Sequence, residues 1–233
     1  MVSGVGRCPA MRGFCLDSPG SKQARSVGAD PPDPLPGLLL MLHGGRSVSS
    51  DVTRPGQLSV VRIAALAWPV RRALRGSGII VRRPRFRLRG WNGELASPVA
   101  DLSHWLDEAA EQFGPVPIVL IGHSMGARAA LRAAGHPQVT AVAGLAPWLP
   151  PGEPVGQLAG TRVLLAHGDQ DQVTSPDMTW AFADRAEAVT RVRRVLVAGG
   201  DHAMLRGQPR WQRLAAEFAG SAFGLAGCAE PGR

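Results

Sequence analysis

The sequence contains no tyrosine, one lysine and three cysteines among 233 residues. The cysteines, Cys8, Cys15 and Cys228, all lie near the termini, and an odd number in such positions argues against a disulfide framework. Their spacing does not suggest a zinc site, and no nearby histidine completes one. We therefore expect no metal ion at these cysteines.

Long apolar runs are also missing. The longest, residues 38–42, is far too short to cross a membrane, so no membrane partner is expected. No apolar segment follows the first basic residue in the manner of a secretory signal, which favours a cytoplasmic location. The content of 45% hydrophobic and 19% charged residues is typical of one globular domain.

Positive charge is in excess, with a formal net charge of +8 at pH 7, and nearly all of it is arginine. Eight arginines fall within residues 71–89. They form either a patch for a nucleic acid or another anion, or a solvated face on a helix and an edge loop. The second interpretation is favoured because only Phe86 stands among them as a stacking aromatic, so we do not expect a nucleic-acid partner. The oligomeric state is left open.

The two ends differ in composition from the middle of the chain. Residues 1–34 are rich in Gly, Ser and Pro, and residues 30–36 hold four prolines that fit neither a helix nor a central strand. The pattern predicts a disordered N-terminal tail over 1–34, one domain over 35–222 and a flexible C-terminal tail over 223–233.

Short apolar runs alternate with helical patterns between the tails. Strands are predicted at residues 38–42, 79–82, 117–121, 139–145, 163–166 and 192–197. Helices are predicted at 58–75, 101–113, 127–134, 176–188 and 208–218. We expect Pro69 to kink or break the first helix and Asp101 to start the second. This alternation predicts a mostly parallel sheet with helices on both faces.

Residues 122–126 read Gly-His-Ser-Met-Gly, the pattern of a nucleophile elbow. Ser124 would sit on a tight, strained strand-to-helix turn, and the flanking glycines leave room for it. The pentapeptide alone is a weak signal, but here a buried strand leads in and an alanine-rich helix leads out.

A serine nucleophile needs a histidine to take its proton and a carboxylate to hold that histidine. Two aspartates follow the strand at 163–166, and either could serve. We favour Asp171, which the loop carries past the strand end, and interpret Asp169 as a turn former. His202 follows the strand at 192–197 in a Gly-rich loop and is the candidate base.

The oxyanion of a tetrahedral intermediate needs amide donors. One should be the backbone amide of Met125, directly after the nucleophile. The second should come from the His-Gly-Gly sequence at residues 43–45, with Gly45 preferred and Gly44 as the alternative.

Four sequence motifs each lie at the end of a predicted strand, in the chain order residues 42–45, 122–126, 167–171 and 200–202. Together they resemble the α/β-hydrolase superfamily over about residues 37–220. Asp201 is a departure, because such proteins often have glycine there. The resemblance implies an α/β-hydrolase fold with the order Ser, Asp, His, and hydrolysis of esters, thioesters or amides without a metal or cofactor.

The family often carries a helical lid after the strand that follows the nucleophile helix. Here residues 147–160 hold four prolines, so we expect no helical lid and an open site. Trp148 and Leu149 should line its rim, with Trp91 opposite, and both tryptophans are candidate substrate-binding residues.

These observations predict a serine hydrolase that cleaves carboxylic ester or thioester bonds of small acyl substrates through an acyl-enzyme. An acyltransferase would use the same residues. A non-catalytic scaffold that binds an anionic partner through its arginines is the alternative of another class. His43, His123 and His167 are expected to be structural, and His104 and His136 are expected to lie at the surface.

Overall fold

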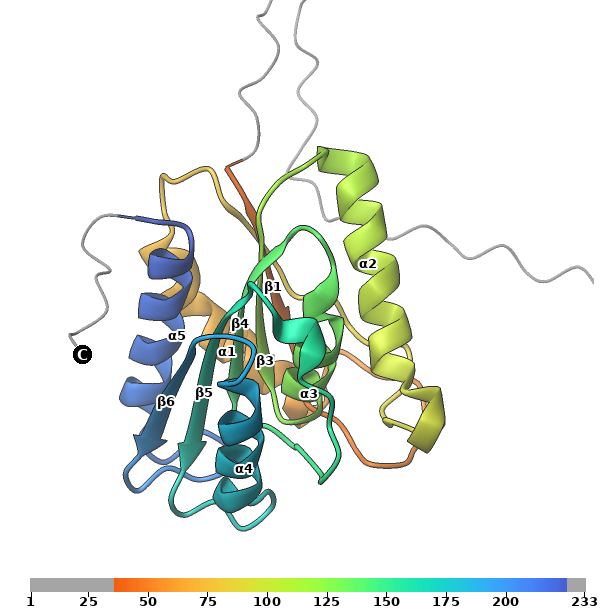
Figure 1. Ribbon diagram of the computed structural model, residues 1–233, viewed down its shortest axis with the longest axis vertical. Helices are drawn as coiled ribbons and strands as arrows, with labels where there is room; N and C mark the ends of the chain where they lie inside the picture. Colours follow the sequence, from red (N-terminus) through yellow and green to blue (C-terminus); the bar gives the residue numbers. More distant parts are fainter. Residues whose placement is uncertain (1–35, 226–233) are drawn as a thin grey trace, which may run out of the picture. The chain divides into compact units, whose positions relative to one another are not determined.

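The computed structural model describes residues 36–225, and six strands form one parallel sheet in the order β2-β1-β3-β4-β5-β6 (Figure 1). The strands are β1 Leu38–Leu42, β2 Ile80–Arg82, β3 Ile118–His123, β4 Val139–Leu145, β5 Arg162–Gly168 and β6 Val192–Val197. All six predicted strands are present with small shifts at their ends, which confirms the predicted parallel sheet.

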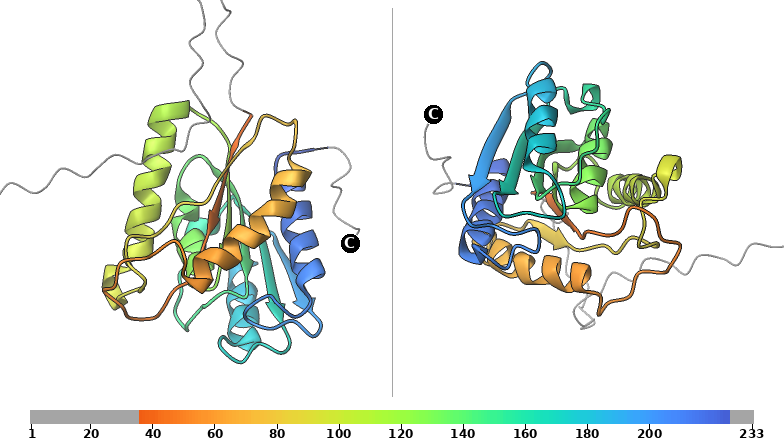
Figure 2. Two further views of the ribbon diagram at one scale, coloured as in Figure 1. Left: turned by 180° about the vertical axis from the view of Figure 1, so that it is seen from behind. Right: turned by 90° about the horizontal axis from the view of Figure 1, so that it is seen from below.

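Helices cover both faces of this sheet (Figure 2). On one face lie α1 Leu58–Ala73 and α5 Gln208–Ala222. On the other lie α2 Ser97–Phe113, α3 Met125–Arg132 and α4 Pro176–Ala186. Single 3₁₀ turns are η1 Gly93–Leu95, η2 Ala133–Gly135 and η3 Gly156–Leu158. The five predicted helices are therefore all present, in the predicted two-faced arrangement.

Strand β1 shows why its sequence is a continuous apolar run. Leu38 and Leu40 face the core under α2, α3 and α4, whereas Leu39 and Met41 face the core under α1 and α5. All are at most 3% exposed. A parallel strand covered by helices on both sides has no solvent face, so alternation of polar and apolar residues disappears.

Pro69 does not break α1, and that part of the prediction was wrong. The helix continues to Ala73, with Leu66, Ala67 and Val70 buried against α5 and the sheet. The packing of this apolar face offsets the missing backbone donor at the proline.

Asp101 does not start α2, which begins four residues earlier at Ser97. Pro98 suits the first turn of a helix, where backbone amides have no intrahelical acceptor. The carboxylate of Asp101 is instead buried and accepts from Arg87, from its amide at 2.7 Å and from its Nε at 2.6 Å. Asp101 thus fastens the loop after β2 to α2.

Residues 223–225, which follow α5, are also described by the structure. Phe223 packs against the core under α1 and α5, and the Leu225 amide donates to the Gly220 carbonyl at 3.0 Å. The rest of the predicted C-terminal tail and the whole predicted N-terminal tail lie outside the described residues.

The connection from β4 to β5 contains only the turn η3, which confirms the absence of a helical lid there. Over residues 36–225, no helix combines the length and the apolar character needed to span a bilayer.

Candidate active site

Ser124 occupies a strained turn between β3 and α3, with φ 54° and ψ −117°. Such a positive φ is rare for a residue with a side chain and costs free energy. The glycines on either side leave the space for it: a Cβ on Gly122 would overlap the Ala127 amide, and one on Gly126 would lie 2.5 Å from the His43 carbonyl oxygen. The elbow therefore has the geometry that its sequence predicts.

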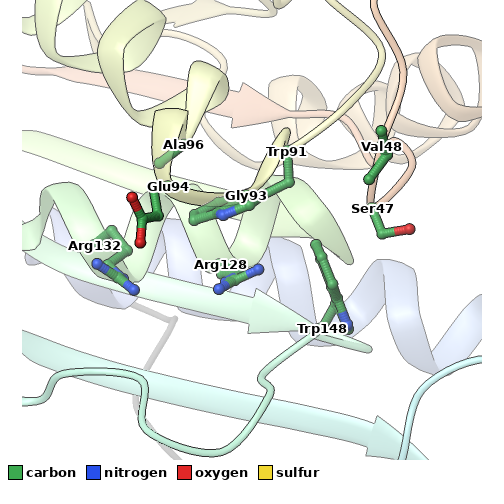
Figure 3. Close-up of a pocket in the computed structure, with 9 residues that line it drawn as sticks. All are labelled: Ser47, Val48, Trp91, Gly93, Glu94, Ala96, Arg128, Arg132 and Trp148. Carbon is green, nitrogen blue, oxygen red and sulfur yellow. The ribbon is translucent and has the colours of Figure 1, made fainter.

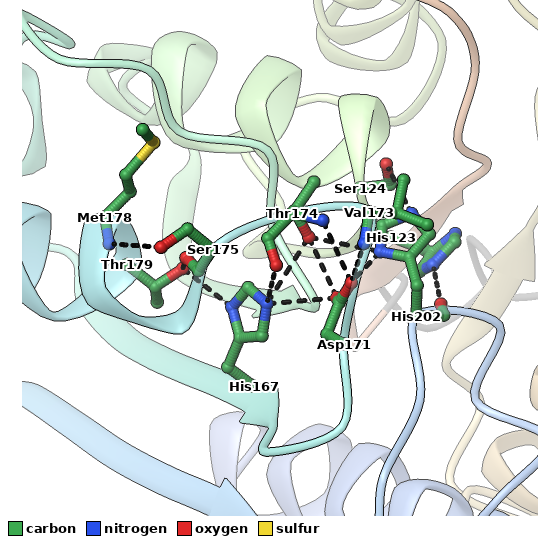
Figure 4. A network of polar contacts seen from close by, with 10 residues as sticks. All are labelled: His123, Ser124, His167, Asp171, Val173, Thr174, Ser175, Met178, Thr179 and His202. Carbon is green, nitrogen blue, oxygen red and sulfur yellow. Dashed lines mark hydrogen bonds and ion pairs between the residues drawn. The ribbon is translucent and has the colours of Figure 1, made fainter.

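Ser124, His202 and Asp171 lie together at the carboxyl edge of the sheet (Figure 4). His202 Nε2 is 3.1 Å from Ser124 Oγ, and His202 Nδ1 is 2.8 Å from Asp171 Oδ2. A carboxylate can only accept, so Nδ1 carries the proton and Nε2 is left to accept from the serine hydroxyl. The three side chains thus form one continuous hydrogen-bonded chain.

Asp171 is the most heavily bonded of the three. Its Oδ1 accepts from the amides of Val173 at 2.8 Å and Thr174 at 2.9 Å. Its Oδ2 accepts from the Thr174 hydroxyl at 2.9 Å, and also from His167 and His202. Burial alone raises the pKa of Asp171, but these donors together lower it well below the usual range. The side chain is fully buried as a carboxylate.

His167 makes a contact that the sequence interpretation missed. Its Nε2 lies 3.0 Å from Asp171 Oδ2, the same oxygen that His202 uses, and its Nδ1 lies 2.8 Å from Thr179 Oγ1. The ring is completely buried. His167 is structural, as expected, but what it holds is the candidate acid. The only available signal was its position at a strand end, four residues before Asp171 in the loop that follows.

The second aspartate of that loop has a different partner. Asp169 is exposed, and its Oδ1 accepts from the Gly199 amide at 2.7 Å, which ties the loop after β5 to the loop after β6. Asp201, the departure from the family pattern, accepts through Oδ1 from the amides of Leu205 and Arg206 at 2.9 and 3.0 Å. The carboxylate of Asp201 thus stabilises the turn that follows His202.

His123 forms a hydrogen bond to the backbone of the candidate base, His202. Its Nε2–H donates to the His202 carbonyl at 2.8 Å, and the two ring centroids are 5.0 Å apart. Burial, together with the positive charge of a protonated His202 and of Arg62, lowers the pKa of His123 to about 3. The ring is therefore neutral at physiological pH.

This burial makes folding sensitive to acid. The unfolded chain protonates His123 near pH 6.5, but the folded protein does so only near pH 3, so the unfolded state binds more protons between these values. Stability must therefore fall as the pH drops through this window. Between pH 7 and pH 5, His123 should account for a loss of about 2 kcal/mol in the free energy of unfolding. Urea denaturation of wild type and His123→Gln at both pH values measures it.

His104→Gln, the exchange of an exposed histidine, is the matched control and should keep the wild-type difference between the two pH values. If His123→Gln loses as much stability between pH 7 and pH 5 as wild type does, the buried neutral state of His123 is not the cause.

His43 is structural, as predicted. Its Nε2 accepts from the Phe86 amide at 3.2 Å, so the proton lies on Nδ1, which donates to the Gly44 carbonyl at 2.7 Å. Burial lowers the pKa of His43 and keeps the ring neutral. His43 thereby fixes the loop after β1, where the second oxyanion donor was expected.

The expected oxyanion donors lie side by side. A Cβ on Gly45 would overlap the Met125 side chain and the Arg89 carbonyl, and one on Gly44 would lie 3.2 Å from Ser124 Cβ. Met125 is the first residue of α3, so its amide has no intrahelical acceptor. Within residues 36–225, no hydrogen bond uses the amide of Gly45 or Gly44. Gly44 thus lies against the candidate nucleophile, and Gly45 lies against the residue that follows it.

A cavity of about 600 Å³ opens between the loop after β1, the turn η1 and helix α3 (Figure 3). Trp91 and Trp148, the candidate substrate-binding residues, both line it, and the Trp148 amide donates to the Ser124 carbonyl at 3.3 Å. Leu149, which was expected at the rim, is 3% exposed and packs in the core instead. The chain bends after Trp148 so that only the tryptophan faces the cavity.

Several arginines of the basic cluster have partners within the molecule. Arg87 pairs with Asp101, and Arg71 Nη2 donates to the Val81 carbonyl at 3.2 Å.

Among the described residues, no group of three or more His, Cys, Asp or Glu side chains could hold a metal ion.

The fold and these geometries define the class, an α/β-hydrolase. The sequence matches the model of the alpha/beta hydrolase family over residues 39–231, and the chain belongs to that family. No curated protein sequence matches it.

Solved structures share the fold at low sequence identity. An alpha-beta serine hydrolase homologue from Coxiella burnetii is 19% identical with a TM-score of 0.59, over 78% of this chain and 84% of that one. Est1E from Butyrivibrio proteoclasticus is 17% identical with a TM-score of 0.58, over 80% and 88%. A serine hydrolase without a lid from Xanthomonas campestris is 21% identical with a TM-score of 0.54, over 86% and 88%.

Proposed function

We propose that the protein is a serine hydrolase that cleaves carboxylic ester or thioester bonds of small acyl compounds. The observation that supports this most is the unbroken chain of hydrogen bonds from Ser124 Oγ through His202 to a buried Asp171. A carboxylate, an imidazole in the Nδ1–H tautomer and a hydroxyl in this order are the parts of an activated serine.

In the proposed reaction, Ser124 Oγ attacks the carbonyl carbon while His202 Nε2 takes the hydroxyl proton. The Met125 amide, with Gly45 or Gly44, donates to the oxyanion. The bond to the leaving group then breaks, and His202 gives its proton to the departing alcohol or thiol. Water attacks the acyl-enzyme with His202 again as base, which releases the acid and restores Ser124. An acyltransferase would differ only in the acceptor of the last step.

Active-site labelling tests this function directly. A fluorophosphonate probe loses fluoride when an activated serine oxygen bonds to its phosphorus. Wild type should be labelled and Ser124→Ala should not, because ordinary serines are too weakly nucleophilic to react. Ser103→Ala, which removes an exposed hydroxyl on α2, is the control and should label as wild type does. Equal labelling of Ser124→Ala and wild type would contradict the proposal.

A panel of short-chain and long-chain nitrophenyl esters, with thioesters alongside, then measures the range of acyl groups. Added alcohols or thiols separate transfer from hydrolysis in the same assay, because a transferase would form a new ester in place of the free acid.

A further inference from the structure

Arg128 stands in an unusual position on the wall of the cavity. Its guanidinium carbon lies 3.8 Å from the ring centroid of Trp91 and 4.5 Å from that of Trp148, and the two rings are 88° apart. The arginine side chain is only 9% exposed. A delocalised cation stacks favourably on indole rings, so the three side chains form a fixed corner, the Arg–Trp corner (Figure 3).

The Arg–Trp corner lies next to the nucleophile. Arg128 follows Ser124 by four residues, and its amide donates to the Ser124 carbonyl at 3.2 Å. Side chains on a helix lean toward its N-terminus, so the guanidinium extends back toward the end of α3 that carries the serine. Trp148 is anchored to the same carbonyl. A short acyl chain on Ser124 would therefore extend toward the corner.

The charge of the corner is only partly compensated. Glu153 is buried and accepts from Arg128 Nε at 2.7 Å and from Arg132 Nε at 2.6 Å, so two guanidiniums share one carboxylate. Glu94 is the acid that lines the cavity itself, and it is exposed, so water screens its charge. The group of Arg128, Arg132 and Glu153 thus carries one net positive charge beside two indoles, where an anion binds more strongly than at an open surface.

We propose that this cavity binds a carboxylate of the substrate, so that the preferred substrates are half-esters of short dicarboxylic acids. This inference rests on the proposed serine hydrolase activity and specifies the acyl group of its substrate. Arg128 binds the free carboxylate, Trp91 and Trp148 pack against the methylene groups, and the ester carbonyl lies at Ser124. The ester bond breaks as before: Ser124 receives the acyl group, the alcohol leaves with a proton from His202, and water then releases the diacid.

Matched pairs of substrates test the inference. The methyl half-esters of succinic, glutaric and adipic acid are compared with methyl 4-methylpentanoate, 5-methylhexanoate and 6-methylheptanoate, in which an isopropyl end replaces the carboxylate. The ratio of kcat/KM within each pair, measured by titrating the released acid, should be about tenfold in favour of the half-ester for at least one chain length.

Arg128→Met should bring that ratio down toward one. Glu153 keeps Arg132 as its partner in this variant, so no buried carboxylate is left unpaired, and the ratio cancels any general loss of activity. Arg75→Met, which removes one exposed positive charge at the end of α1, should keep the wild-type ratio.

The inference fails if wild type hydrolyses both members of every pair equally well, or if Arg128→Met leaves the ratio unchanged; in both cases the serine hydrolase itself stands. If no ester of either kind is hydrolysed and Ser124 is not labelled by the fluorophosphonate, the proposed function fails and the inference fails with it.

Discussion

Alanine at Ser124 should lower kcat for ester hydrolysis by about 10⁶-fold, and alanine at His202 should lower it nearly as much. The two residues act in one step, since the hydroxyl attacks only as the imidazole 3.1 Å away removes its proton. The double variant should therefore be no slower than the worse of the two single variants. Initial rates with one activated ester, measured on all three proteins, check both expectations.

Ser103→Ala again serves as the control and should retain wild-type kcat. If the losses of the two single variants multiply in the double variant, the residues work independently and the proposed proton transfer between them is wrong. A Ser124→Ala protein that keeps more than a hundredth of the wild-type rate would exclude Ser124 as the nucleophile.

Asp171→Asn should lower kcat by about 10⁴-fold while the fold is retained. The carboxylate keeps the proton of His202 on Nδ1, and an amide that turns its NH₂ toward the ring favours the proton on Nε2 instead. Nε2 could then no longer take the proton of Ser124. Rates with the same activated ester measure the loss, and thermal unfolding shows whether the variant stays folded.

Asp169→Asn is the matched control, an identical exchange two residues earlier in the same loop. Its side-chain oxygen can still accept from the Gly199 amide, so kcat should change by less than about threefold. A larger loss of kcat in Asp169→Asn than in Asp171→Asn would show that the acid has been assigned to the wrong aspartate.

The strands and the placement of the motifs could be predicted because both depend on local sequence. A buried parallel strand must be apolar on both faces, so runs such as residues 38–42 are visible without a structure. Ser124, Asp171 and His202 each follow such a run, and the carboxyl ends of parallel strands meet at one edge. The sequence therefore predicted which side chains come together, although not their distances.

Other features depend on contacts between distant residues and left no local pattern. Asp101 follows a helix-start pattern, yet Arg87 binds it 14 residues away in the sequence. Proline is disfavoured inside a helix because it has no backbone N–H, yet α1 continues through Pro69 because its apolar face packs on α5. The bond from His167 to Asp171 depends on the path of one loop, and the Arg–Trp corner depends on three segments that meet only in the folded chain. Propensities describe single elements and cannot supply these pairings.

The link between β4 and β5 has a consequence for how molecules enter and leave. Glu153 is bound to Arg128 and Arg132, and its carbonyl accepts from Arg185 Nη1 at 2.6 Å, so this link is tied to two helices. The link itself contains no α-helix, only the turn η3. A link held in this way is not a moving lid, so for the proposed hydrolase we expect no gating motion of this segment to delay the arrival of substrate or the departure of product. Turnover of the proposed hydrolase would then be limited by the chemical steps or by how tightly product is held.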